Sequence, residues 1–181
     1  GRGLITHEDL ETYEALWRDP ITLSYRGYEI FSMPPSSSGG VVLAIILNVL
    51  GGYDSLPAFG TANLVHLETE AMRSAFIDRN HYLGDPAFVE MPLDRLTSLD
   101  HANEWRDRIV RGEAGTTPPF DPAVYESTET THYSIVDEAG NAASVTTTLN
   151  LGYGSGITVP GAGFLLNDEM DDFAAKPGSP N

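Results

Sequence analysis

Two alternating segments, at residues 129–137 and 144–150, constrain what this chain can fold into more than any other feature. Both are rich in β-branched residues and alternate with a period of two, which is typical of strands. The short run between them is rich in turn formers, so the sequence predicts a β-hairpin. Folding back at this turn places Thr130 opposite a position between Thr148 and Asn150. Thr148 and Asn150, two apart in a strand, share one face, so three hydroxyl or amide side chains meet at one end of the hairpin.

A threonine in the middle of a chain is a poor nucleophile, because its hydroxyl proton is hard to remove and no histidine here has a spacing that guarantees contact. A threonine at a chain terminus is activated by its own α-amine, whose pKa of about 7.7–8.0 suits a general base. Cleavage between Glu129 and Thr130 would therefore create a catalyst, and the same Oγ can perform the cleavage by attacking the Glu129 carbonyl carbon. The alternative, which the pattern alone favours, is a threonine-rich strand with a structural role only.

Composition excludes several classes of function. With 181 residues, 41% of them hydrophobic, the chain has the size of one domain and can form a core. Ten basic against 26 acidic residues give a net charge of -16, which excludes nucleic acid and anionic membrane surfaces as expected partners. The chain has no cysteine for disulfides or thiolate sites, no stretch typical of a membrane span, and no signal-peptide pattern at residue 1.

Periodicity and cap residues predict a mostly helical region before residue 112. A Pro/Ser/Gly run at 34–40 lacks the lysine of a phosphate-binding loop, so we expect a packing role for it. His66 and Glu70 are spaced like zinc ligands, but no third ligand has matching spacing, and no metal site is expected. The expected elements are a short helix from Thr6 to the stop at Asp19-Pro20, a hairpin over 21–33, and helices over 41–50, 61–83 and 98–111.

Residues 112–128 are rich in Gly, Pro and Thr and are typical of an exposed linker. The glycines of a loop at 151–156 permit close backbone approach to a ligand or an unusual φ, and residues 164–166 resemble a short buried strand. The acidic cluster at 167–172 has three interpretations: a calcium loop, a helix start rich in capping acids, or a pocket for an ammonium group. Residue types alone favour the helix start, because the calcium pattern lacks its central glycine.

Several longer motifs occur in one order along essentially the whole chain, and together they resemble the γ-glutamyltransferase family. A set of such motifs in register is far more specific than any one of them. They are Met33-Pro34-Pro35-Ser36-Ser37-Ser38-Gly39-Gly40, Asp78-Arg79, Tyr82-Leu83-Gly84-Asp85-Pro86, Thr130-Thr131-His132-Tyr133-Ser134, Thr148-Leu149-Asn150, Gly154-Ser155-Gly156, Leu165-Leu166-Asn167 and Met170-Asp171-Asp172-Phe173.

The resemblance implies an α+β fold, namely part of the four-layer αββα sandwich of the N-terminal nucleophile hydrolases. In that family a single precursor cuts itself before a threonine to give a large and a small subunit. The matching position is Thr130, with Glu129 on the other side of the cut. Residues 1–129 would then be the end of a large-subunit region and 130–181 the start of a small-subunit region.

The resemblance also implies the reaction and its residues. Thr130 takes a γ-glutamyl group from glutathione or a related amide and passes it to water, an amino acid or a peptide, without a metal or organic cofactor. Thr148 would support the Thr130 hydroxyl, and Asn150, Glu169 and Asp172 would hold the amino and carboxylate ends of the glutamyl group. Bacterial members of the family are often periplasmic or secreted, so a periplasmic or extracellular location is expected.

This chain departs from the family in length. Family members are considerably longer, so we expect the chain to lack several sheet strands, the Gly-Gly pair that stabilises the oxyanion, and the rest of both subunits. Two other functions remain open. Relatives that cleave glutaryl side chains from β-lactams use the same kind of nucleophile, and an unprocessed, inactive chain would act only by binding a partner through its acidic surface.

Overall fold

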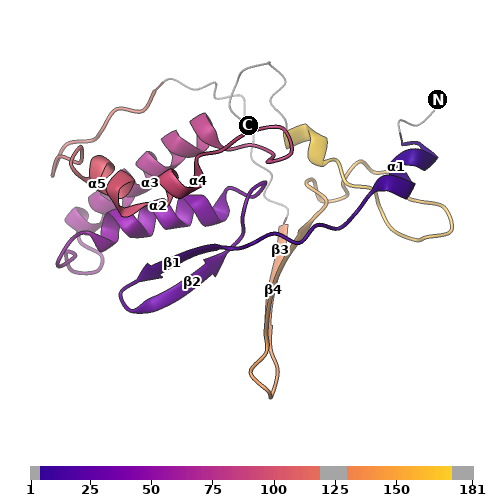
Figure 1. Cartoon of the computed structure of the whole chain (residues 1–181), viewed down its shortest axis with the longest axis horizontal. Coiled ribbons are helices and arrows are strands. Elements are labelled where there is room, and N and C mark those ends of the chain that lie inside the picture. The colour runs from indigo at the N-terminus through magenta and orange to yellow at the C-terminus, as the bar shows by residue number, and fades with distance from the viewer. Residues whose placement is uncertain (1–4, 119–129, 173–181) are drawn as a thin grey trace. The chain divides into compact units, whose positions relative to one another are not determined.

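The computed structural model describes residues 5–118 and 130–172 (Figure 1). The chain forms two compact units, Gly1–Thr117 and Pro118–Asn181. The predicted boundary between subunit regions adjoins Glu129, which lies outside the described residues, so that boundary stays a prediction. Among the helices within these ranges, none combines the length and the apolar character needed to cross a membrane.

Three helices form the core of the first unit. The helix α2 (Gly39–Gly51) packs along α3 (Ala62–Tyr82), as Figure 1 shows, and α5 (Leu99–Arg106) packs against both. The apolar spacing that predicted these helices also supplies their buried faces, because residues three and four apart lie on one side of a helix. The buried cluster consists of Val41, Ile45, Val49, Leu50, Leu67, Ala71, Ala75, Leu96 and Ala102.

The starts of α3 and α5 confirm the predicted cap residues. The Thr61 hydroxyl accepts a hydrogen bond from Leu64 N at 3.3 Å, and the Ser98 hydroxyl accepts one from His101 N at 3.2 Å. Each hydroxyl satisfies a backbone donor that has no partner within its helix. A short helix that we did not predict, α4 (Leu93–Leu96), precedes Ser98.

A hairpin and a buried polar contact complete this unit. The strands β1 (Ile21–Tyr25) and β2 (Tyr28–Ser32) pair as predicted, with Ile21 opposite Ser32, and β1 packs on α2. On the other side, the buried Asp78 carboxylate of α3 accepts hydrogen bonds from His101 Nε2 and Trp105 Nε1 of α5, both at 2.7 Å. These two bonds tie α5 to α3, since a buried carboxylate requires such partners.

The first helix is shorter than predicted. The capping box between Thr6 and Asp9 is present, but α1 (His7–Thr12) ends well before Pro20. The apolar side chains whose spacing predicted the longer helix are exposed, and Trp17 is 102% exposed. A short helix without an apolar surface to pack against is marginal in water, which explains its early end.

The second unit contains a longer hairpin and a compact acidic turn. Its elements are β3 (Thr130–Val136), β4 (Ala142–Thr148) and the 3-10 helix η1 (Glu169–Asp172). The predicted buried strand at 164–166 is wrong: only Leu165 forms a bridge, to Thr158, and Phe164 is 56% exposed. Helices and strands together confirm the α+β class, while the layered sandwich stays a prediction, because the described strands form two separate pairs.

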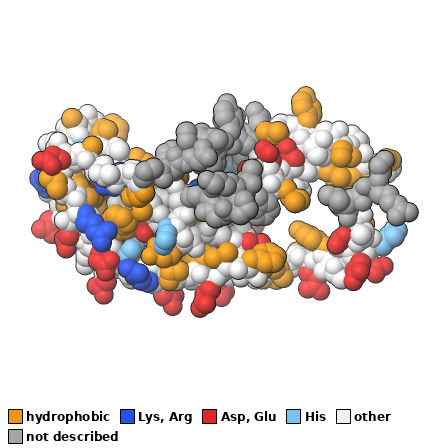
Figure 2. Space-filling model, turned by 90° about the horizontal axis from the view of Figure 1, so that it is seen from above, with side chains coloured by type: hydrophobic (Ala, Val, Ile, Leu, Met, Phe, Trp, Pro, Cys, Tyr) orange, Lys and Arg blue, Asp and Glu red, His pale blue; other side chains and the backbone are white. Residues whose placement is uncertain are grey.

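The surface matches the acidic composition. Figure 2 shows carboxylate side chains spread over the visible face, with hydrophobic side chains between them. A net charge of -16 produces a negative potential that repels polyanions.

The core of the first unit gives a stability prediction. Leu67 is 2% exposed, so Leu67→Ala should lower the free energy of unfolding by about 2–5 kcal/mol through lost burial and a residual cavity. Val65, two positions away on the same helix, is 53% exposed, and Val65→Ala should change stability by less than about 0.5 kcal/mol. Urea unfolding followed by circular dichroism measures both, and equal effects would contradict the assigned core face.

Candidate active site

The register of the β3–β4 hairpin is set at its closed end by Asp137. Its Oδ1 accepts hydrogen bonds from Ala139 N at 3.0 Å and Asn141 N at 2.8 Å, and its Oδ2 accepts one from Asn141 Nδ2 at 2.8 Å. Gly140 has a φ of 82°, which glycine adopts without strain. An aspartate that bonds the backbone of its own turn fixes the loop length, and loop length fixes the register.

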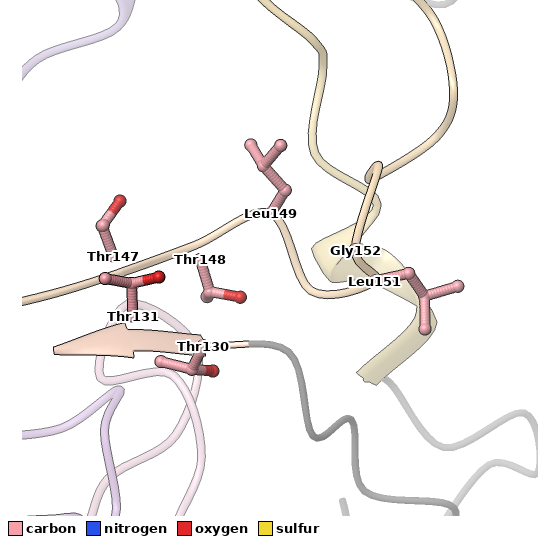
Figure 3. Close-up of a pocket in the computed structure, with 7 residues that line it drawn as sticks. All are labelled: Thr130, Thr131, Thr147, Thr148, Leu149, Leu151 and Gly152. Carbon is pink, nitrogen blue, oxygen red and sulfur yellow. The ribbon is translucent and has the colours of Figure 1, made fainter.

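This register places Thr130 directly opposite Thr148 at the open end of the hairpin. The sequence predicted a partner between Thr148 and Asn150, and the structure confirms that window. Side chains of directly opposed residues lie on one face of an antiparallel pair, and Figure 3 shows both hydroxyls turned toward the loop that carries Leu151 and Gly152. Two hydroxyl groups therefore meet where β3 begins.

An open depression of about 300 Å³ lies at this end of the hairpin (Figure 3). Two consecutive threonines of each strand line it, together with residues of the loop after β4. Such a volume accommodates a small molecule. The lining residues are Thr130, Thr131, Thr147, Thr148, Leu149, Leu151 and Gly152.

Asn150 does not lie on the strand face that the sequence predicted. The strand β4 ends at Thr148, and Asn150 has a φ of 74°, in the left-handed region that asparagine adopts more readily than most residues. Its side chain turns inward, since Asn150 is 4% exposed and its Nδ2 donates to Asp168 O at 3.3 Å. Its backbone N donates to Thr148 Oγ1 at 2.9 Å. Asn150 therefore links the Thr148 hydroxyl to the acidic segment.

Backbone contacts hold the acidic segment beside the end of β4. Asp168 N donates to Leu149 O at 3.1 Å, and Leu151 N donates to Asp168 Oδ1 at 3.1 Å. Gly154 lies so close to this segment that a Cβ there would be 2.2 Å from Leu166 O, so only glycine fits. The predicted unusual φ is confirmed at Gly154 and Gly156, whose φ values are 52° and 70°.

The acidic cluster itself forms the 3-10 turn η1, which begins where Asn167 Oδ1 accepts from Glu169 N at 3.1 Å. Burial raises the pKa of the Glu169 carboxyl, and the nearby Asp172 and Asp168 carboxylates raise it further. Its Oε1 is buried, with no hydrogen-bond partner among the described residues. A nearby cationic group would stabilise the ionised form of a carboxyl in this setting. The interpretation of the cluster as a pocket for an ammonium group requires such a carboxyl.

The structure brings together some of the predicted site residues but not all of them. Thr130 and Thr148 share one depression, whereas Asn150, Glu169 and Asp172 lie outside its lining. Glu129 lies outside the described residues. Over the described parts of the chain, no group of three or more His, Asp or Glu side chains is arranged to hold a metal ion.

His132 is a candidate site residue that the sequence analysis did not predict. Its Nδ1 lies 2.8 Å from Thr146 Oγ1, and its Nε2 lies 3.3 Å from the hydroxyls of both Ser134 and Ser144. Positions 130, 132 and 134 share one face of β3, so this imidazole lies on the same face as Thr130. Period-two spacing from Thr130 was the signal that could have identified it.

Comparison with known proteins identifies relatives along the whole chain. Residues 1–181 match the protein family described as Gamma-glutamyltranspeptidase. The chain is 48% identical over 183 residues to the glutathione hydrolase proenzyme of Escherichia coli (strain K12), a match that covers 99% of the chain and 32% of that relative. It is 42% identical over 178 residues to the acylase ACY 1 proenzyme of Pseudomonas sp. (strain V22), covering 97% and 32% respectively.

A solved structure agrees with these matches. The crystal structure of cephalosporin acylase from Bacillus halodurans superposes with a TM-score of 0.81 at 31% identity, and covers 98% of this chain and 31% of that one. The chain thus spans about a third of the length of these relatives.

The pKa values of two carboxyl groups in the second unit should be shifted in opposite directions. Burial raises the pKa of Glu169, while hydrogen bonds from Asn141 lower the pKa of Asp137. Carboxyl-carbon NMR should therefore show Glu169 titrating above, and Asp137 below, the ordinary range. Because the Glu169 pKa is raised on folding, its contribution to stability falls as pH rises through that raised pKa. Glu169→Gln should remove this fall, and the reverse order of titration would contradict the described environments.

Proposed function

Because the chain belongs to the gamma-glutamyltranspeptidase family, we propose that it carries the nucleophile of a γ-glutamyl-transferring enzyme, Thr130. In this proposal the bond between Glu129 and Thr130 is cut, and the freed threonine removes a γ-glutamyl group from glutathione or a related amide. Water, an amino acid or a peptide then accepts the group. Relatives named as proenzymes support the cleavage step.

The observation that carries this proposal is the pairing of Thr130 with Thr148 at the edge of an open depression. Thr130 is the first residue of β3, so a new terminus there keeps its hydroxyl in a fixed strand. The Thr148 hydroxyl, already held by Asn150 N at 2.9 Å, belongs to the residue directly opposite and can donate a hydrogen bond to Thr130 Oγ as that oxygen loses its proton. A nucleophile fixed in this way loses little entropy on reaction.

The cleavage and transfer use the same atoms. Thr130 Oγ attacks the Glu129 carbonyl carbon, the peptide C–N bond breaks as the nitrogen takes up a proton, and water hydrolyses the resulting ester to a Glu129 carboxylate. The freed α-amine then accepts the Oγ proton when Oγ attacks the substrate γ-carbonyl. The leaving amine takes up that proton, and the acyl-enzyme is resolved by the acceptor.

The acidic turn would recognise the other end of the glutamyl group. We assign Asp172 and Glu169 to the substrate ammonium and Asn150 to the substrate carboxylate. The raised Glu169 pKa and its unpartnered buried Oε1 support this, since both are relieved by a bound cation.

A second candidate function is glutaryl transfer of the cephalosporin acylase kind. The similarity to the acylase ACY 1 proenzyme and to the Bacillus halodurans structure favours it. A glutaryl group has no ammonium, so such an enzyme does not need Asp172.

An unprocessed, inactive chain that only binds a partner is the third alternative. In this proposal the rest of both subunits completes the enzyme, because these relatives are about three times as long. We also propose a periplasmic or extracellular location.

Processing tests the nucleophile directly. Thr130→Ala should abolish cleavage, so that intact mass and a denaturing gel show one full-length species while the wild type yields a product that begins Thr-Thr-His-Tyr-Ser. Thr131→Ala is the matched control: Thr131 lines the same depression, but its side chain lies on the opposite face of β3. Equal processing in wild type and Thr130→Ala would show that the nucleophile is assigned wrongly.

Substrate recognition separates the two enzymatic functions. In the assembled enzyme, Asp172→Ala should leave processing intact and raise KM for a γ-glutamyl anilide by about tenfold or more, because a charge-assisted contact is lost. KM for a glutaryl anilide should not change. Steady-state kinetics with both anilides measures this, and preferential turnover of the glutaryl compound by the wild type would favour the acylase.

A further inference from the structure

The ribbon formed by β3 and β4 has one apolar face and one polar face. Opposed pairs of an antiparallel ribbon alternate between its two faces. The apolar face carries Tyr133 opposite Val145 and Ile135 opposite Ala143. The other face continues from the candidate nucleophile into a row of hydroxyl groups with one imidazole among them. We call this set the polar row, and its pairs are Thr130 with Thr148, His132 with Thr146, and Ser134 with Ser144.

His132 joins the two strands within the polar row. Its Nδ1 lies 2.8 Å from Oγ1 of Thr146, the residue directly opposite, and its Nε2 lies 3.3 Å from the Oγ atoms of Ser134 and Ser144. A hydroxyl group can donate and accept, so these contacts form with either neutral tautomer of the imidazole. Two of the three contacts reach from β3 to β4. His132 therefore clamps the strands together at the pair next to Thr130 on this face.

The open end of the ribbon depends on such a clamp more than the closed end does. At the closed end the turn joins the strands covalently, and Asp137 bonds the turn backbone. At the open end, the proposed cut after Glu129 makes Thr130 the first residue of its chain, and chain ends open most readily. A two-stranded ribbon is itself only marginally stable. The candidate nucleophile therefore lies where the strand opens with the least cost in free energy.

We propose that His132 is a positioning residue for Thr130. It ties the free end of β3 to β4 through Thr146 and Ser144, and so keeps the Thr130 hydroxyl opposite Thr148 after cleavage. This inference rests on the proposed function, because the hydroxyl that is held is the proposed nucleophile. A displacement of about 1 Å at a reacting group can lower a rate by about 10²-fold, so a clamp two residues away affects catalysis without contacting the reacting atoms.

Steady-state kinetics of the assembled, processed enzyme tests this role. His132→Ala should lower kcat for a γ-glutamyl anilide by about three- to tenfold, the effect of one or two lost hydrogen bonds. KM should stay within about twofold of the wild-type value, because the residues assigned to substrate binding are unchanged. Thr146→Val replaces the partner hydroxyl by a methyl group of similar shape and should also lower kcat. The double variant should be no slower than His132→Ala, since both changes remove one interaction.

Two further variants separate positioning from other roles. His132→Asn keeps a polar atom near the place of Nδ1 and should recover most of the lost kcat, whereas an amide cannot replace a general base. Tyr133→Phe is the matched control, because it removes a hydroxyl from the adjacent position on the apolar face and should keep the wild-type kcat. Unchanged kcat in His132→Ala and Thr146→Val, additive losses in the double variant, or no recovery in His132→Asn would each overturn the positioning role.

Amide hydrogen exchange tests the clamp without catalysis. In the 181-residue chain carrying Thr130→Ala, which stays uncut, His132→Ala should accelerate exchange of the protected amides at the open end of the ribbon by about three- to tenfold. The Asn141 amide, which Asp137 holds at the closed end, should keep its rate. Unchanged exchange at the open end, or equal acceleration at both ends, would overturn the clamp.

The two experiments together distinguish this inference from the proposed function. Faster exchange at the open end with a wild-type kcat in His132→Ala would overturn the positioning role and leave the proposed function intact. A wild type that never yields the Thr130 terminus, or that turns over no anilide when assembled, would overturn both.

Discussion

The pairing of Thr130 with Thr148 fixes the geometry on which the candidate site depends. That pairing is decided at the other end of the hairpin, where Asp137 bonds the backbone of Ala139 and Asn141. In an antiparallel pair, a slip of one residue would turn every side chain to the other face. The Asp137 carboxylate in the turn therefore determines which hydroxyl of β4 faces Thr130.

The hairpin and its register window were predictable because both depend on local chemistry, namely period-two alternation and a turn rich in Gly, Asn and Asp. Asn150 was not predictable. Its left-handed φ and its inward side chain depend on Asp168, a residue distant along the chain. Strand periodicity stops at Thr148, and sequence alone shows no reason for the chain to turn there.

In the first unit, too, features set by local interactions were predictable and features set by distant residues were not. The helices α3 and α5 begin at the predicted caps, Thr61 and Ser98, because capping is a local interaction. The end of α1 was predicted wrongly, since apolar spacing indicates a buried face without showing whether anything covers it. The partners of Glu70 and of Asp78 also escaped prediction, because backbone amides and a ring on another helix have no signature in the spacing of the carboxylates themselves.

Both hairpins also leave strand edges open within the described residues. Within the described residues each sheet has only two strands, so every strand has one outer edge of unpaired N–H and C=O groups. Tyr133 and Ile135 on β3 add exposed apolar surface beside such an edge. Open edges of this kind accept a strand from another molecule, and a two-stranded ribbon alone is only marginally stable. The hairpin of β3 and β4 can therefore accept a further strand at either outer edge.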